Sequence, residues 1–232
     1  MNWDLIETVT VDSYSTLVDV DSQAAALEEF VDDLEDPAAV SRLWRNQYIL
    51  YSVVANDIEA YRPFDELIDL GLRYALESHG HDVESEVRER IRRTVYEERL
   101  AVFEDVPPGI RRIVEAGYDV YVVSNGSPAM LEHLVEAAEL EGVVSGVVSA
   151  DEVRTYKPDR EIYRHAAARA GTPIDRILHV SGGTMRDVWG AKHAGMHSCW
   201  LARPEKSPPR EHLGVDPDLE VESFLDLADR ID

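Results

Sequence analysis

Short apolar runs rich in β-branched residues recur in this chain and are bounded by turn-forming residues. Three of them occupy positions 6–11, 118–123 and 176–180. Runs of this length and composition are typical of strands buried on both faces of a sheet. From about residue 106 onward, such runs alternate with helical patterns, including one over 160–170, and this alternation predicts a parallel sheet.

Between residues 24 and 100 the apolar positions instead follow a helical spacing, with breaks at Pro- and Gly-containing sites. The breaks lie near positions 36–37, 62–63 and 79–82. This pattern predicts a helical cap inserted after the first strand of an α/β core. The predicted core comprises residues 1–18 and 106–232, and the predicted cap residues 19–105. Within the core, residues 204–217 are expected to form a loop and 221–231 a closing helix.

Polar residues follow the predicted strands at the points where the strands end. Asp12 comes directly after the first run, Ser124 and Asn125 after the second, and Ser181 after the third. Carboxyl ends of parallel strands meet at one edge of a sheet, where α/β proteins bind ligands, so we expect these side chains to lie together. Turn capping is the alternative role for Asp12, Thr16 and Ser124, because Asp, Ser and Thr cap turns often.

Three motifs in this order resemble those of the haloacid dehalogenase superfamily. They are Asp-Ser-Tyr-Ser-Thr-Leu at 12–17, Ser-Asn-Gly-Ser-Pro at 124–128 and Tyr-Lys-Pro-Asp at 156–159. The resemblance is closest to the (S)-2-haloacid dehalogenases and extends over nearly the whole chain, including Leu43-Trp44-Arg45 in the predicted cap. It implies a Rossmann-like parallel-sheet core flanked by helices, with the cap over the carboxyl edge of the sheet.

The resemblance also implies a reaction, in which Asp12 displaces halide from a short 2-haloalkanoic acid and water hydrolyses the ester. Lys157 would keep Asp12 ionised and is a candidate partner for the substrate carboxylate. Thr16 and Ser124 would hold the nucleophile or the substrate by hydrogen bonds. Arg45 and Asn125 would form the halide cradle. The remaining substrate-binding positions implied are Tyr14, Ile49, Phe64 and Tyr163.

The fourth motif departs from the dehalogenase pattern. Ser181 and Asp187 keep their places and are expected to orient the hydrolytic water, but the segment between them is one residue longer. Its spacing is closer to that of phosphatase relatives, with Gly182 at a position where these carry a metal-binding Asp, and Tyr14 stands where they carry an acid. We therefore expect neither a metal nor another cofactor. A phosphatase or other small-molecule hydrolase with a degraded metal site, and a non-catalytic member, remain alternatives.

Charge excludes some partners. The chain carries 46 acidic and 23 basic residues, a net charge of −23, and only three of its 232 residues are lysines. This balance argues against nucleic acid and anionic membranes as partners. The small-molecule substrate that we expect is what the resemblance implies. A Lys-poor acidic surface resembles that of halophilic proteins. We further expect a cytoplasmic protein, because no signal peptide or membrane span is evident, and a possible homodimer, because relatives are often dimeric.

Overall fold

The computed structural model describes residues 3–20, 22–204, 207 and 210–231. Its centre is a parallel six-stranded sheet in the order β5-β4-β1-β6-β7-β8. The strands are β1 (Thr8–Val11), β4 (Asp119–Ser124), β5 (Gly146–Ser149), β6 (Ile177–Ser181), β7 (His197–Leu201) and β8 (Leu219–Val221). The α/β fold class predicted from the sequence is confirmed.

Strand β1 is the middle of the sheet and is buried along its whole length. It pairs with β4 on one side and β6 on the other, with Thr8 opposite both Asp119 and Ile177. The chain builds outward from β1 to β5 and then returns to β6. The strand order therefore reverses beside β1, and such a reversal opens a ligand crevice at the carboxyl ends of the strands.

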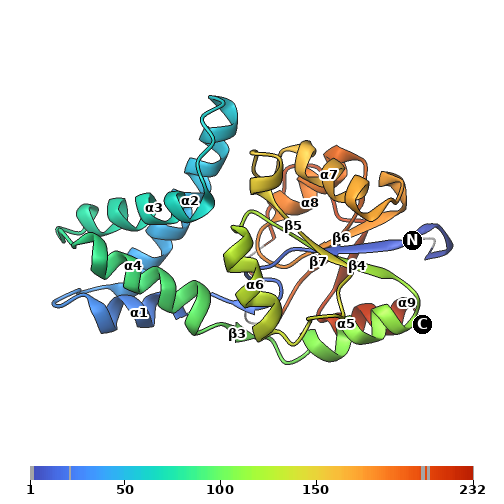
Figure 1. The fold of residues 1–232 in the computed structure, drawn as a ribbon, viewed down its shortest axis with the longest axis horizontal. Coiled ribbons are helices and arrows are strands. Elements are labelled where there is room, and N and C mark those ends of the chain that lie inside the picture. The colour runs from blue at the N-terminus through green and yellow to red at the C-terminus, as the bar shows by residue number, and fades with distance from the viewer. Residues whose placement is uncertain (1–2, 21, 205–206, 208–209, 232) are drawn as a thin grey trace.

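Helices cover both faces of the sheet (Figure 1). Val9 and Val11 of β1 belong to an apolar cluster with residues of α5 (Val106–Glu115) and α9 (Phe224–Ile231). The other face carries α7 (Arg160–Ala170) and α8 (Met185–Ala194), whereas α6 (Pro128–Ala137) follows β4. A sheet covered on both faces needs strands that are apolar throughout, which explains the continuous apolar runs.

The limits of α7 are the ones predicted. Asp159 accepts a hydrogen bond from the backbone N–H of Glu161, which caps the first turn, and Gly171 ends the helix in the left-handed conformation at φ +68°. Both the N-cap aspartate and the terminating glycine are local signals that can be recognised in the sequence. The predicted closing helix is shorter than expected, because residues 219–221 join the edge of the sheet as β8.

The segment between β1 and α5 is helical, and we call residues 22–98 the helical segment. It contains α1 (Ser22–Phe30), α2 (Pro37–Asp57), α3 (Phe64–Ser78), α4 (Ser85–Arg93) and a π-helical turn (Thr94–Glu98). Asp36 caps α2, with Pro37 in its first turn. Helices α2 and α3 pack closely at Gly71, where a Cβ would lie 3.0 Å from the backbone nitrogen of Tyr48.

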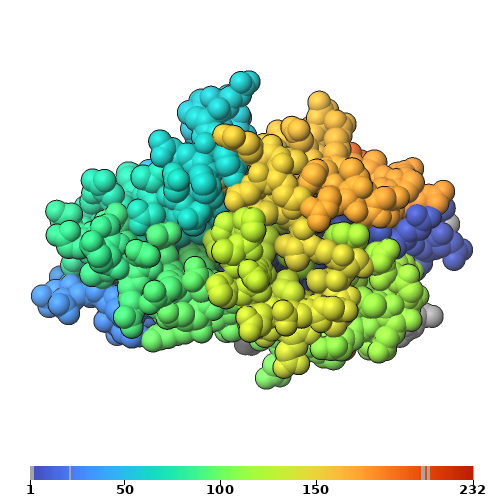
Figure 2. All heavy atoms as spheres, viewed as in Figure 1, coloured from blue at the N-terminus to red at the C-terminus, as the bar shows by residue number. Residues whose placement is uncertain are grey.

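Strands β2 (Val18–Asp19) and β3 (Ala101–Val102) pair antiparallel, so the two ends of the helical segment lie side by side. In Figure 1, β1 runs toward this segment, which therefore lies at the carboxyl edge of the sheet. The space-filling view shows the segment and the core meeting along a seam on the face drawn (Figure 2). One apolar cluster includes residues of both parts, such as Trp44 and Tyr156. The domain limits named above remain a prediction.

Two further sequence predictions concern the outer parts of the chain. Of the loop predicted at 204–217, residues 205–206 and 208–209 lie outside the described part, and the remainder forms no helix or strand. Within residues 3–20, 22–204 and 210–231, no helix is long and apolar enough to cross a membrane.

Candidate active site

Asp12 follows the last residue of β1 and is 9% exposed. Its backbone N–H donates to the carbonyl of Val180 at 2.9 Å, so the position of its Cα is fixed by the sheet. The chain then turns through Ser15, which has φ +70°, a conformation uncommon for residues other than glycine. This turn brings Thr16 back to Asp12: its hydroxyl donates to Oδ2 at 2.7 Å and accepts from the N–H of Gly182 at 2.9 Å.

Lys157 connects the two aspartates of the site. Its Nζ lies 2.5 Å from Asp12 Oδ1, 2.5 Å from Asp187 Oδ2 and 3.1 Å from the carbonyl of Val123. An ammonium has three donors, so all of them are engaged by these acceptors. The side chain is buried, and the backbone N–H of Lys157 donates to Asn125 Oδ1 at 2.8 Å. Lys157 is therefore positioned between both carboxylates, and it has no donor left for a substrate.

The opposite charges of Lys157 and Asp187 stabilise each other's charged forms. Burial by itself would lower the pKa of Lys157, but Asp12 and Asp187 outweigh it and raise this pKa above its ordinary value. For Asp187, burial acts to raise the pKa, and the Lys157 ammonium, aided by His179 and Arg186, holds it well below its usual range. Near neutral pH, therefore, Lys157 is protonated and Asp187 is a carboxylate.

Asp187 lies in the first turn of α8 and is supported from below by two buried rings. His179 Nε2 is 3.8 Å from Asp187 Oδ2, and Nδ1 of the same ring shares a 2.9 Å hydrogen bond with Thr10. The Tyr163 hydroxyl donates to the Asp187 carbonyl at 3.3 Å. The family resemblance implies a substrate-binding role for Tyr163, but its ring is fully buried and does not line the pocket. It fills the space that Gly190 leaves, where a Cβ would lie 2.6 Å from the hydroxyl.

The end of β4 contributes hydroxyl and amide groups. Ser124 Oγ lies 2.6 Å from Ser13 Oγ and accepts a hydrogen bond from the Gly126 N–H at 3.0 Å. Asn125 accepts from Lys157 through Oδ1, and this contact leaves its amide NH₂ without a partner among the described residues. Ser181, at the end of β6, also lines the pocket, and its buried Oγ has no hydrogen-bond partner among them. The Asn125 and Ser181 groups are available to a bound molecule.

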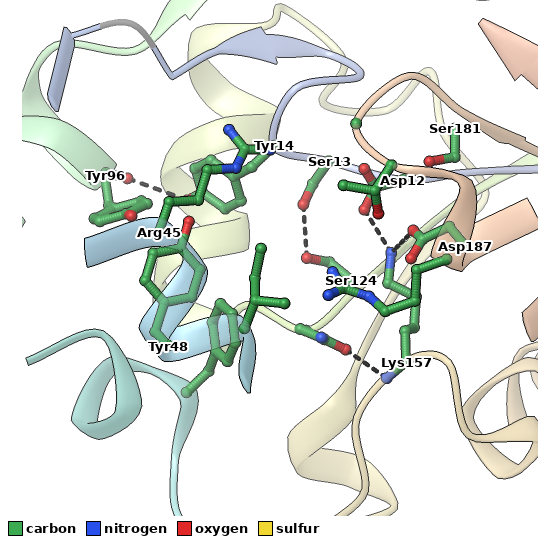
Figure 3. A pocket seen from close by; sticks show the side chains of 16 residues that line it. Asp12, Ser13, Tyr14, Arg45, Tyr48, Tyr96, Ser124, Lys157, Ser181 and Asp187 are labelled. Atoms are coloured by element: carbon green, nitrogen blue, oxygen red, sulfur yellow. Dashed lines mark hydrogen bonds and ion pairs between the residues drawn. The ribbon is translucent and has the colours of Figure 1, made fainter. Parts of the chain in front are cut away.

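The helical segment and the turn after β1 provide an aromatic wall (Figure 3). The rings of Tyr14 and Tyr96 meet edge-on with centroids 5.3 Å apart, and those of Tyr48 and Phe64 at 5.6 Å. The Tyr14 hydroxyl donates to the carbonyls of Tyr96 and Met130 at 3.3 and 3.4 Å. Burial raises the pKa of Tyr14 well above its ordinary value, so this group does not act as an acid–base catalyst near neutral pH.

The pocket encloses about 70 Å³. A single water needs roughly 10–15 Å³ of such space, so the pocket accepts a small organic molecule. Two guanidiniums line it as well. Arg45 of α2 donates to Ser15 Oγ at 2.8 Å, whereas Arg186 makes no hydrogen bond or ion pair with a described residue. Arg45 and Gly183 also line a second cavity of about 320 Å³.

The structure brings most of the predicted site residues to this one pocket. Ten of them line it: Asp12, Tyr14, Arg45, Ile49, Phe64, Ser124, Asn125, Lys157, Ser181 and Asp187. Thr16 lies behind Asp12 and Tyr163 lies outside. The wall residues that sequence reasoning missed are Ser13, Tyr48, Tyr96, Gly183, Thr184 and Arg186. Position would have identified two of them, because Tyr48 is one helical turn after Arg45 and Arg186 directly precedes Asp187.

The donor set does not fit the Mg²⁺ ion of phosphatase relatives. Mg²⁺ takes an octahedral shell of oxygen ligands built on carboxylates, but both pocket carboxylates are bound to Lys157. No side chain extends from Gly182, where a Cβ would lie only 3.0 Å from the carbonyl of Ser15. Within the described ranges, no group of three or more His, Cys, Asp or Glu residues is arranged to hold a metal.

Comparison with known proteins places the chain in a family. The model of the haloacid dehalogenase-like hydrolases matches residues 6–195. The (S)-2-haloacid dehalogenase of Pseudomonas sp. (strain YL) is 30% identical over 221 residues, which are 95% of this chain and 92% of that protein.

Solved structures agree with this placement. One L-2-haloacid dehalogenase has a TM-score of 0.87 and 31% identity, with 97% of this chain and 98% of the other covered. The L-2-haloacid dehalogenase of Xanthobacter autotrophicus with chloropropionic acid covalently bound also has a TM-score of 0.87, at 26% identity and the same coverage. The resemblance drawn from the motifs is thus confirmed, and this chain belongs to the haloacid dehalogenase-like hydrolases.

Proposed function

We propose that this protein hydrolyses short 2-haloalkanoic acids to 2-hydroxy acids and halide through an ester on Asp12. The observation that carries the proposal is the Asp12 carboxylate in a small pocket, held by Thr16 and by the Lys157 ammonium. The names of the relatives, which are (S)-2-haloacid and L-2-haloacid dehalogenases, point to the same reaction.

In the first step, a carboxylate oxygen of Asp12 attacks the carbon that bears the halogen. A carbon–oxygen bond forms as the carbon–halogen bond breaks, and the electron pair of that bond leaves with the halide. Halide is the anion of a strong acid and needs no proton to leave. Tyr14, whose hydroxyl is committed to two carbonyls, therefore suffices where a phosphatase needs an acid.

The halide develops negative charge only as the bond breaks, so its stabilisation acts on the transition state. Arg45 and the unpaired NH₂ of Asn125 both line the pocket and are donors of the kind that this charge requires. Ile49 and Phe64 give the same wall its apolar part. A low-dielectric wall strengthens the attraction between the donors and the leaving halide.

In the second step, water attacks the carbonyl carbon of the ester and restores the Asp12 carboxylate. The alkoxide of the product takes one proton, and the other is released to solvent. Ser181 has a free buried hydroxyl in the pocket, and Asp187 is a carboxylate there, so both are suited to orient this water. Lys157 lowers the pKa of Asp187, so Asp187 is suited to orient the water and does not retain the proton that the water loses.

The test is bromide release from both enantiomers of 2-bromopropionate, at high salt, with chelator and separately with Mg²⁺. We expect turnover that does not depend on added metal. The matched control is Asp12→Asn, which keeps the shape of the side chain but replaces a strong nucleophile by a weak one and should abolish bromide release. Release of phosphate from phosphate esters that strictly requires Mg²⁺, with no bromide release, would establish the phosphatase alternative.

Isotope labelling distinguishes the ester from direct attack by water. In a single turnover in ¹⁸O water, the oxygen transferred to the product comes from Asp12, so the first product should be unlabelled. Product that is fully labelled from the first turnover would contradict an ester on Asp12.

Arg45 offers a test of the halide cradle. Loss of one preorganised donor costs on the order of 10²–10³ in rate, so Arg45→Ala should lower kcat by this factor and change KM less. Arg45→Lys should restore little, because an ammonium does not reproduce the planar fork of a guanidinium. Near-wild-type kcat in Arg45→Ala would remove Arg45 from the mechanism.

A further inference from the structure

Arg186 is a cation without a hydrogen-bonded or ion-paired partner among the described residues of an unusually acidic protein, although its charge helps to lower the pKa of Asp187. The chain has 46 acidic residues against 23 basic ones, and even so Arg186 forms no ion pair or hydrogen bond with any residue that the structure describes. Its Nε is buried and lacks an acceptor. The side chain lines the same pocket as Asp12 and Lys157. A buried donor without an acceptor costs free energy, so a bound group that accepts from it would relieve this cost.

The local structure does not explain an arginine at this position. Arg186 is the second residue of α8, and the partial positive charge of a helix N-terminus disfavours a cation there. Asp187, the next residue, is the kind of side chain that a first turn favours. Arg186 therefore opposes the helix dipole without gaining an ion pair, which favours a role toward a ligand over a role in stability.

Two other candidate partners for a substrate carboxylate, Lys157 and Ser124, are already engaged by groups of the protein. All three donors of Lys157 are used by Asp12, Asp187 and a backbone carbonyl. Ser124 Oγ is engaged by Ser13 and by a backbone N–H. The family resemblance makes Lys157 a candidate partner for the substrate carboxylate, but the hydrogen bonds of Lys157 leave it no donor for that contact.

We propose that Arg186 binds the carboxylate of the substrate, an inference that rests on the proposed function. The fork of a guanidinium matches a carboxylate with two parallel hydrogen bonds. Charge agrees with one such ligand: Lys157, Arg45 and Arg186 carry three positive charges, and Asp12 and Asp187 carry two negative ones. One monocarboxylate makes the pocket neutral. Arg186 thus selects for acids and orients the halogen-bearing carbon toward Asp12.

The experiment removes the charge from the enzyme and, separately, from the substrate. Bromide release is measured with 2-bromopropionate and with 2-bromopropionamide, which lacks the charge, for the wild type, Arg186→Met and Arg186→Lys. Hydrogen bonds to a charged group predict a wild-type preference for the acid, in kcat/KM, of about 10- to 100-fold. The carboxylate does not react, so Arg186→Met should act mainly on KM and should abolish most of this preference.

Two variants serve as controls. Arg42→Met removes the same charge from an exposed position on α2, so it should keep the preference for the acid. Arg186→Lys keeps the charge without the fork and should retain an intermediate preference. If Arg186→Met lowers kcat/KM for acid and amide by the same factor, Arg186 does not contact the carboxylate, and the inference fails although dehalogenation stands.

A binding measurement separates this inference from the proposed function. Propionate, which has no halogen, is titrated into the wild type and Arg186→Met by calorimetry. Weaker binding to the variant by about 10- to 100-fold supports a carboxylate site at Arg186 even if no haloacid is turned over. Equal propionate affinity in the two proteins overturns the inference, whether or not halide is released.

Discussion

Replacing Lys157 with methionine tests how the site holds its two carboxylates. Methionine has a similar length but no charge, so the change removes the ammonium and little volume. Asp12 and Asp187 would then face each other across the space that Nζ occupies, where each now lies 2.5 Å from it. The carbonyl of Val123 would also lose its 3.1 Å contact.

The cost follows from burial. The Lys157 side chain is 3% exposed, and those of Asp12 and Asp187 are 12% and 6% exposed. Removing one member of a buried ion pair typically costs about 3–5 kcal/mol, because the remaining charge is buried without compensation. We expect Lys157→Met to lower the free energy of unfolding by this amount at neutral pH and to abolish dehalogenation.

The loss in the free energy of unfolding caused by Lys157→Met should grow as the pH rises. In the variant, burial and like charge raise the carboxyl pKa values above their unfolded values of about 4, so the folded state binds more protons than the unfolded state. Stability then falls as the pH rises through the range in which these carboxyls lose their protons. In the wild type the pKa of Asp187 is lowered, and its contribution is lost only as the pH falls below its unfolded pKa.

Urea unfolding at about pH 5 and about pH 8 measures the loss in the free energy of unfolding and its dependence on pH. The control is Lys192→Met, since Lys192 and Asp218 form a pair at 2.6 Å on the surface in which both side chains are 29% exposed. Pairs of this kind contribute about 0–1 kcal/mol, so this variant should be nearly neutral.

The double variant Lys157→Met/Asp187→Asn keeps the test decisive if the single variant does not fold. It removes one of the two facing charges, so it should be more stable than the single variant and still inactive. If Lys157→Met costs less than about 1 kcal/mol at pH 8, or if its cost does not depend on pH, the carboxylates are not held as described.

Three further predictions follow from the same contacts. Thr16→Val leaves Asp12 and the Gly182 N–H each without a hydrogen bond, so we expect a loss of about 1–3 kcal/mol in urea unfolding and a lower kcat, with Thr16→Ser close to wild type. The profile of kcat/KM against pH should stay flat up to about pH 10, because the pKa of Lys157 is raised above its ordinary value; a basic limb near pH 8 would contradict this. Gly182→Ala places a Cβ 3.0 Å from the carbonyl of Ser15, so it should destabilise the protein by about 1–3 kcal/mol in the same unfolding assay. An unchanged unfolding midpoint would show that the turn shifts to accommodate the added methyl group.

The parts of the fold that local signals specify could be predicted from the sequence. Strand β1 is a run of apolar and β-branched residues, and α7 carries its N-cap Asp159 and its terminating Gly171. Strands β5 and β8 were not predicted, because four and three residues with half-buried positions carry little period of their own. Their pairing comes from the neighbouring strand, which is a tertiary effect.

The site likewise contains residues that could be predicted from the sequence and residues that could not. Asp12, Ser124 and Lys157 could be predicted because each follows a strand or belongs to a motif. Tyr96 could not, because it reaches the pocket only through the π-helical turn at the end of the helical segment. Arg186 was missed for another reason: the sequence shows a charge but not its contacts, and only the packed structure shows that it lines the pocket without a hydrogen bond or ion pair to a described residue.

The central position of β1 has a consequence for how the chain folds during synthesis. The first strand to be synthesised, β1, lies between β4 and β6. Thr8 of β1 can pair in the sheet only after Asp119 and Ile177 have been synthesised. The β2–β3 ladder closes residues 20–100 into one excursion and so shortens the effective separation between β1 and β4. The middle of the sheet is therefore completed late, after β6 is synthesised. Deletion of residues 1–11 would remove β1, the strand that joins the β5-β4 part of the sheet to the β6-β7-β8 part.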